Sequence, residues 1–514
     1  MKRSDSLVIS KKTLGLIAAA MIYLCVSMAV FLSSPSSSEQ GLKYLGVFHP
    51  ILFLVTIGFI IFDYIRRGYW FNLTNFMLVL IFIYMGLGSL YYVTHFDSIP
   101  HETLKFPKFA LQSFWLVCFS AVVFKVGALL SNNRFVSRIR LFPRKDKNRI
   151  FDNRIRIGII IAFTISIIIK FIKFKAGHFG FASEMADNTS SSLTILSLLE
   201  NLGYISVMVS LYYWFTTQRL TKLDKILCLS FIVILLLFAL LYGMKGKVLY
   251  VILIAVIPAI LVGRKQGRQV FSRKFYILVF ASFAIFWALN PLIRAVMVEN
   301  KSTSIIFAAQ NTITSIGTGI EIYQTLSNER DFNSDWQNIY TNSIDQIWSR
   351  VSLFRYFNSV VAQTGPGQRD FRAWERYPYL PISILPRALI PDKPTNDYSA
   401  QFNLDYISNI YNSTTPSALG WAYMESGVLG ILILFGVLGL LYGMIDNYVF
   451  RQCDLSVYGV SIFGVLFMQL ANLEPDPYWL LNGLPHQLIL LLVAYAIIFL
   501  RPTVLMDARK LKEL

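Results

Sequence analysis

The long polar segment of residues 298–418 carries nine basic side chains, and seven of them are arginines. A guanidinium group binds phosphate through two parallel hydrogen bonds and stays charged at any physiological pH, whereas a lysine ammonium acts as a point charge. The arginine content therefore favours binding of a phosphate-bearing anion. The alternative is that these cations pair with the acidic residues of the same segment. The nine are Lys301, Arg330, Arg350, Arg355, Arg369, Arg372, Arg376, Arg387 and Lys393.

Three more cations lie close to the ends of apolar runs. Lys245 and Lys247 form the turn Gly-Met-Lys-Gly-Lys, and Arg294 follows an Asn-Pro pair. Charges that are buried near the ends of membrane helices are costly, which makes these three candidates for a functional role. The alternative is that their long side chains extend to the membrane surface and are solvated there.

Glu425 is the acidic side chain best suited to chemistry, because the pattern predicts it roughly two turns into an apolar helix. Partial burial raises the proton affinity of a carboxylate, which can then act as a general base for a hydroxyl group. Pairing with an arginine is the alternative role. Glu200 and the Glu474-Pro-Asp476 turn are further acidic candidates.

The elements that must position these side chains are membrane helices. The 514 residues are 55% hydrophobic, with a mean hydropathy of +0.54, and apolar runs of about 20 residues recur with short polar gaps. Continuous apolar runs predict helices rather than a membrane β-barrel, so we expect an all-α polytopic membrane protein with about twelve spans. The predicted spans are 14–32, 45–65, 76–93, 108–130, 157–174, 193–215, 226–243, 248–263, 275–296, 419–444, 457–472 and 487–500.

The net charge of +18 follows the predicted membrane topology. Nine basic residues lie between Arg134 and Arg156 and five between Arg264 and Lys274, both in predicted cytoplasmic loops. Short cytoplasmic loops are enriched in Lys and Arg, so this distribution predicts that both termini are cytoplasmic and that the polar segment is extracytoplasmic. The basic clusters are therefore explained by topology and lipid headgroups, without a nucleic-acid partner.

This topology divides the chain into residues 1–297 with nine spans, the extracytoplasmic loop 298–418, and residues 419–514 with three spans and a cytoplasmic tail. Within the loop, Ser343–Ala362 has the apolar periodicity of an amphipathic helix, with Arg350 and Arg355 near the edges of its apolar stripe. The five prolines of Tyr377–Pro394 predict an extended strip that carries Arg387 and Lys393.

Several classes of function are disfavoured. The sequence has no Walker A loop, dinucleotide fingerprint or HExxH motif, and its four cysteines have neither zinc-site spacing nor a position in an outer loop. We therefore expect no cofactor and no metal. A reaction catalysed by this chain would use a substrate that is already activated.

Three local motifs carry a family resemblance: Leu385-Pro-Arg-Ala-Leu-Ile-Pro-Asp-Lys-Pro394, Gly420-Trp-Ala-Tyr-Met-Glu-Ser-Gly427 and the Gly-Met-Lys-Gly-Lys turn. Together with the helix count and one large late loop, they resemble the Wzy-type O-antigen and oligosaccharide repeat-unit polymerases. The resemblance implies a GT-C-like membrane glycosyltransferase of the bacterial cytoplasmic membrane. It also implies a substrate of oligosaccharide linked to undecaprenyl diphosphate, with a flippase and a chain-length regulator as partners.

Under this resemblance the candidate residues take specific roles. Arg294, Arg350, Arg355 and Arg387 would bind the diphosphate, with Lys245, Lys247 and Lys393 as further contacts, and Arg294 would also stabilise the leaving charge. Glu425 would accept the proton of the acceptor hydroxyl. Arg350, Arg355 and Arg387 are then expected to face a cavity at membrane level.

Two alternatives remain. An O-antigen ligase shares the helix count, the donor and the large loop, but ligases are expected to use a histidine in that loop, and residues 298–418 contain none. A flippase or other transporter of lipid-linked oligosaccharides would carry charges along a central pathway and would not need a loop of this size.

Overall fold

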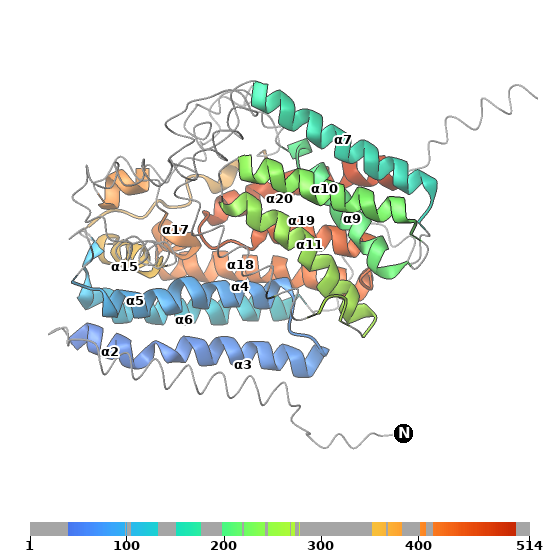
Figure 1. The fold of residues 1–514 in the computed structure, drawn as a ribbon. Helices are drawn as coiled ribbons and strands as arrows, with labels where there is room; N and C mark the ends of the chain where they lie inside the picture. The colour runs from blue at the N-terminus through green and yellow to red at the C-terminus, as the bar shows by residue number, and fades with distance from the viewer. Residues whose placement is uncertain are drawn as a thin grey trace, which may run out of the picture.

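The protein is all-helical in the residues that the structure, a computed structural model, describes (Figure 1). Those residues are 40–97, 99, 104–131, 151–175, 198–217, 220–241, 245–267, 269–272, 277, 352–365, 368–382, 401–407 and 415–499. The predicted spans 14–32 and 275–296 lie outside them, apart from residue 277.

Seven helices within the described residues are long and apolar enough to cross a membrane, so the chain is a polytopic α-helical membrane protein. Each overlaps a predicted span. The seven candidate spans are Leu42–Ile65, Leu73–Thr94, Pro107–Leu130, Asn153–Lys173, Lys247–Lys265, Val428–Gln452 and Pro477–Phe499.

The bundle is built from long helices that run side by side (Figure 1). The shorter helices α15 and α17 lie together at one end, which we call the loop end. The bounds are α2 Gln40–Phe48, α3 Pro50–Arg67, α4 Leu73–Ile81, η1 Phe82–Leu87, α5 Gly88–Thr94, α6 Pro107–Leu130, α7 Asn153–Lys175, α9 Leu202–Thr216, α10 Lys222–Leu241, α11 Lys245–Lys265, α15 Phe354–Gln363, η5 Tyr377–Tyr379, η6 Asn403–Ile407, α17 Ser417–Ser426, α18 Val428–Asn447, η7 Tyr448–Gln452, α19 Val457–Leu470 and α20 Pro477–Phe499.

Among the helices that the structure describes, α6 and α18 share the most extensive contact, and glycines allow their close approach. A Cβ atom added to Gly439 would collide with the carbonyl oxygen of Phe124, and one added to Gly443 would come within 2.5 Å of the carbonyl oxygen of Ala128. Between membrane helices, small residues permit the backbone contact that drives association. This pair therefore forms a rigid axis that leads to the loop end.

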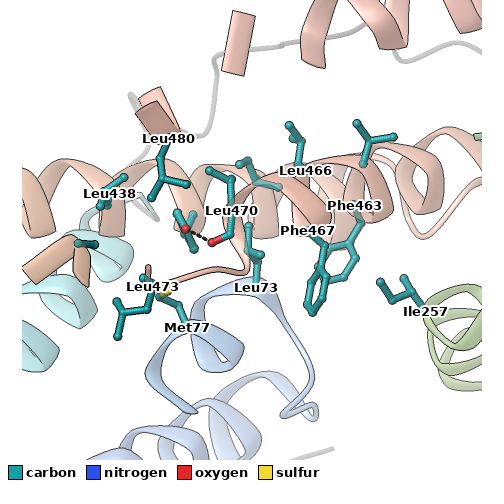
Figure 2. Packing of buried hydrophobic residues seen from close by; sticks show 14 of the residues in the cluster. Leu73, Met77, Ile257, Leu438, Phe463, Leu466, Phe467, Leu470, Leu473 and Leu480 are labelled. Carbon is teal, nitrogen blue, oxygen red and sulfur yellow. Dashed lines mark hydrogen bonds between the residues drawn. The ribbon is translucent and has the colours of Figure 1, made fainter. Parts of the chain in front are cut away.

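Helix α19 lies in the middle of the apolar core. Figure 2 shows Phe463 and Phe467 of α19 near Ile257 of α11, with Leu73 and Met77 of α4 close by. The Tyr442 hydroxyl of α18 donates a hydrogen bond to the carbonyl oxygen of Leu470 at 2.5 Å, which satisfies the last turn of α19. The core thus includes residues of α4, α11, α18 and α19.

The predicted span 419–444 is wrong at its start. The chain forms two helices there, α17 and α18, which break at Gly427 with φ of +65° and ψ of −135°. An L-residue rarely adopts that conformation, whereas glycine does so at no steric cost. Glu425 therefore lies at the end of a short buried helix before the membrane span, instead of two turns inside the span.

Three other boundaries also differ from the sequence expectation. Helix α20 starts at Pro477, ten residues before the predicted span, and continues through Pro485. Helix α9 starts only at Leu202, after a turn at Glu200 and Asn201. In the expected extended strip, the described part forms a short 3₁₀ turn, Tyr377–Tyr379, because the fixed φ of proline also suits the first turn of a helix.

Candidate anion-binding site

Three segments that are far apart in the chain meet at Arg376. Arg376 belongs to the described part of the polar loop, Glu425 lies in the last turn of α17, and Asp476 directly precedes α20. All three side chains are buried, with 5%, 1% and 9% of their respective surfaces exposed. The polar loop is therefore anchored to the ends of two helices by charged groups.

Each carboxylate of this cluster has two partners. Arg376 Nη2 donates to Glu425 Oε1 over 3.1 Å, and its Nη1 donates to Asp476 Oδ2. Glu425 Oε2 accepts the backbone N–H of Trp374 at 2.9 Å, and Asp476 Oδ1 accepts that of Tyr478, also at 2.9 Å. Buried charges are tolerated when they are paired and hydrogen-bonded in this way.

The cluster combines one cation with two anions, and its electrostatics follow from that ratio. Burial raises the pKa of Glu425, and Asp476 adds to this effect, while the guanidinium of Arg376 opposes it. Burial alone would lower the pKa of Arg376, but Asp476 and Glu425 reverse the effect, so the pKa is raised. Glu425 is consequently a carboxyl group that binds a proton more readily than an exposed glutamate does.

A second arginine, Arg372, contacts the same aromatic ring as Arg376. The guanidinium carbon of Arg372 lies 4.8 Å from the centroid of the Trp421 ring, and that of Arg376 lies 5.6 Å from it. Burial lowers the pKa of Arg372, and the neighbouring charge of Arg376 lowers it further. A phosphate group bound between the two guanidinium groups would relieve their repulsion.

The backbone that presents the two arginines is held in an unusual conformation. Ala373 and Trp374 both have positive φ, 52° and 66°, a conformation that costs non-glycine residues about 1–3 kcal/mol each. The backbone N–H of Ala373 donates to the carbonyl oxygen of Glu425 at 3.0 Å, and that of Arg372 to the carbonyl oxygen of Met424 at 2.8 Å. The last turn of α17 therefore positions the arginines through its backbone and through the Glu425 side chain.

A third arginine extends this face toward solvent. Arg369 is exposed, lies 4.9 Å from the centroid of the Tyr406 ring, and donates to the carbonyl oxygen of Asp405. Arg369, Arg372 and Arg376 thus follow one another along the loop, each over an aromatic ring. We call these three residues the arginine face.

Arg355, a predicted diphosphate ligand, lies on α15 and is buried. Its Nη2 donates to the Tyr356 hydroxyl over 2.7 Å, and its guanidinium carbon lies 4.6 Å from the centroid of that ring. Helix α15 packs on α17, with Phe357 and Tyr423 in edge-to-face contact. The helices that carry Arg355 and Glu425 are therefore neighbours, and the part played by Arg355 in binding stays a prediction.

The other predicted residues are placed only in part. Lys247 lies in the first turn of α11 and acts electrostatically on Glu200 and Lys170. Lys245 begins the same helix, but the position of its side chain is outside the described part of the structure. Arg294, Arg350, Arg387 and Lys393 also lie outside the described residues, as does any cavity that Arg350 and Arg387 would face.

The sequence named Arg372 and Arg376 among the cations of the loop and Asp476 among the acidic candidates, but it did not predict that the three meet. Signals were present: the two arginines are four residues apart in a charged stretch that follows Gly365-Pro-Gly, and Asp476 belongs to the Glu-Pro-Asp turn. Their association, however, joins positions 100 residues apart for Arg376 and Asp476, which no local pattern encodes.

Among the residues that the structure describes, no group of three or more His, Cys, Asp or Glu side chains is placed to hold a metal ion. The described cysteines are free: Cys118 and Cys228 are buried, and Cys453 is partly exposed.

No protein-family model, curated protein or solved structure matches the chain, so its class rests on its own features. Those features define an α-helical membrane protein with a charged cluster at one end of its bundle.

Proposed function

We propose that the chain is a membrane glycosyltransferase that joins oligosaccharide repeat units carried on undecaprenyl diphosphate. It would act at the outer face of a bacterial cytoplasmic membrane and build a surface polysaccharide. The sequence resemblance supports this proposal, as do the apolar candidate spans and the loop that packs on the ends of α17 and α20.

The arginine face is the observation that carries the proposal. Arg372 and Arg376 both contact the Trp421 ring, and Arg376 is hydrogen-bonded to a carboxyl group with a raised pKa, at the end of a membrane bundle. Paired guanidinium groups suit a diphosphate, and a position at the bundle end suits a headgroup whose lipid tail lies in the bilayer.

The proposed reaction exchanges one bond at the anomeric carbon of the donor sugar and transfers one proton. The acceptor hydroxyl oxygen attacks the anomeric carbon of the donor sugar, and the bond from that carbon to the diphosphate oxygen breaks. Undecaprenyl diphosphate leaves with the bonding electron pair, and the arginines stabilise its added charge. When the diphosphate binds, it replaces Glu425 as the partner of Arg376. The Glu425 carboxylate then accepts the proton of the acceptor hydroxyl.

A product assay in proteoliposomes tests this function. Full-length protein is reconstituted and supplied with lipid-linked repeat units, and the glycan is released and sized. We expect chains longer than one repeat together with free undecaprenyl diphosphate. Unchanged single repeats in protein of confirmed fold would contradict the proposal.

A transporter of lipid-linked oligosaccharide is the second candidate, and a buried ion pair inside the bundle favours it. Lys125 Nζ on α6 lies 2.7 Å from Asp63 Oδ2 on α3, and both side chains are almost fully buried. Ionisable residues within membrane helices often mark a transport pathway. In the same proteoliposomes, movement of single repeats between leaflets without longer chains would identify this function.

A further inference from the structure

A second cluster of cations lies where α7 ends and where α9 and α11 begin. Lys170 Nζ lies 2.5 Å from Glu200 Oε1, and Lys173 Nζ lies 2.9 Å from Glu200 Oε2. Lys247 acts electrostatically on both Lys170 and Glu200. Three ammonium groups thus converge on the neighbourhood of one carboxylate; we call Lys170, Lys173 and Lys247 the lysine cluster.

The members of the lysine cluster differ in exposure. Lys170 is 1% exposed and lies near two aromatic rings, 5.4 Å from the centroid of Tyr204 and 5.9 Å from that of Phe238. Lys173, with 14% of its side chain exposed, and Lys247 are less completely buried, so solvent reaches both side chains. The Lys170–Glu200 ion pair is therefore the buried part of the cluster, and the other two cations lie nearer the surface.

The lysine cluster belongs to the loop end of the bundle. Tyr250, one turn after Lys247 on α11, acts electrostatically with Glu474, whose carbonyl oxygen accepts the Thr415 hydroxyl at 2.9 Å just before α17 begins. Tyr204 also interacts electrostatically with both Tyr250 and Glu200. The lysine cluster and the turn that carries Asp476 are therefore within electrostatic range of the same tyrosines.

Cations at this end run against the topological preference of membrane proteins. In the predicted topology the loop end faces away from the cytoplasm, where short loops are depleted of Lys and Arg. Three lysines held around one glutamate produce a local positive potential, and such a potential attracts anions to the surface. Lysine also binds phosphate as a point charge and does not require the fixed geometry of a guanidinium fork.

We propose that Lys170, Lys173 and Lys247 form a second binding site for a phosphate-bearing headgroup. This inference rests on the proposed function, because joining two lipid-linked units requires two diphosphates at once. The arginine face, beside Glu425, holds the donor whose diphosphate departs. The lysine cluster holds the acceptor, whose diphosphate stays attached and needs attraction without stabilisation of a leaving charge.

A binding experiment tests the proposal independently of polymerisation. Full-length protein in lipid nanodiscs is titrated with farnesyl diphosphate, as the lipid probe, and with inorganic diphosphate, as the soluble probe. The test variant is K173Q/K247Q, which leaves the buried Lys170–Glu200 pair intact. The matched control is K175Q, because Lys175 is exposed and two positions from Lys173, which places it on another side of α7.

We expect K173Q/K247Q to weaken binding of farnesyl diphosphate by about tenfold or more in protein that remains folded, with K175Q equal to wild type. An equal loss for inorganic diphosphate shows that the phosphates alone are recognised, whereas a loss for the farnesyl compound only shows that the lipid is required. Wild-type affinity in K173Q/K247Q for both probes would overturn the proposal.

Failure of this inference and failure of the proposed function give different results. If the proteoliposomes produce no longer chains but K173Q/K247Q still loses affinity, the lysine site stands and the polymerase function falls. If chains lengthen and K173Q/K247Q binds both probes and extends chains as wild type does, the polymerase stands and the lysine site falls.

Discussion

Asp476 and Glu425 share one arginine, so the charged cluster depends on all three members. Removing one partner of a buried ion pair leaves a charge without compensation, which is more costly than the pair is stabilising. The backbone of Trp374 and the start of α20 also depend on these carboxylates. At the scale of single residues, the cluster anchors the polar loop to α17 and α20 and positions Arg376 and Glu425 in the proposed site.

Replacing Asp476 with Asn is expected to destabilise the protein by about 3 kcal/mol, because Arg376 loses a charged partner in a buried site. Thermal or denaturant unfolding in detergent measures the change. Asp370, which is exposed in the same loop, provides the control, and D370N should unfold like wild type. Equal stability of D476N and wild type would show that the ion pair contributes nothing.

The raised pKa of Glu425 predicts a specific pH dependence. The folded protein holds this proton more tightly than the unfolded chain, whose glutamate pKa is near its ordinary value of 4.5. The stability gained from the protonated group is therefore complete below that value and is lost as the pH rises through the raised pKa. The stability of wild type relative to E425Q should fall over that window and then level off.

The comparison is made by unfolding both proteins across a pH series from about 4 to 7. A difference that rises with pH would mean that ion pairing with Arg376 outweighs burial and that the folded pKa of Glu425 is lowered. Glu425 would then be a structural carboxylate and a poor general base.

At the scale of elements, the α6–α18 pair depends on glycine. Replacing Gly439 with Ala should destabilise the protein by about 1–3 kcal/mol, because the new methyl group would meet the carbonyl oxygen of Phe124 in α6. The control is G58A on α3, where a Cβ would have no neighbour within 4 Å. There the better helix propensity of alanine should leave stability unchanged or raise it by up to about 1 kcal/mol.

Thermal unfolding of the two alanine variants measures this prediction. A stable G439A protein would show that α6 and α18 can separate without cost, and that the pair is not the rigid axis inferred from the glycines.

The long helices were predictable because continuous apolar runs identify membrane spans directly. The expected span 108–130 and the observed α6, Pro107–Leu130, differ by one residue at the start. The break at Gly427 was not predictable in this way, because α17 and α18 are both apolar and the break depends on the loop that packs against Glu425. The apolar pattern of residues 417–447 is compatible both with one continuous helix and with two helices separated at Gly427.

The site was less predictable than the helices. Arg376, Glu425 and Asp476 are far apart in sequence, and their association depends on how the loop folds back onto α17 and α20. Glu425 was recognised from its burial pattern alone. Lys170 and Lys173 lie near the end of a predicted span, where a solvated lysine is the ordinary expectation, so their pairing with Glu200 required the structure.

At the scale of the whole molecule, two charged clusters lie at one end of an apolar bundle. One is rich in arginine and acidic residues, and the other is rich in lysine. Under the proposed function, the first stabilises a departing diphosphate and the second holds a diphosphate that is retained. In the predicted topology, most of the +18 net charge of the chain lies in cytoplasmic segments, and under the proposed function these few cations at the loop end would carry the chemistry.

The central claim is that the arginine face stabilises the leaving diphosphate, and the rate of chain extension by R372Q tests it most directly. In proteoliposomes supplied with lipid-linked repeat units, R372Q is compared with wild type and with R451Q, an exposed arginine of η7 in a predicted cytoplasmic segment. We predict that R372Q extends chains about a hundredfold more slowly at unchanged thermal stability, while R451Q matches wild type. Wild-type extension by R372Q would contradict the account.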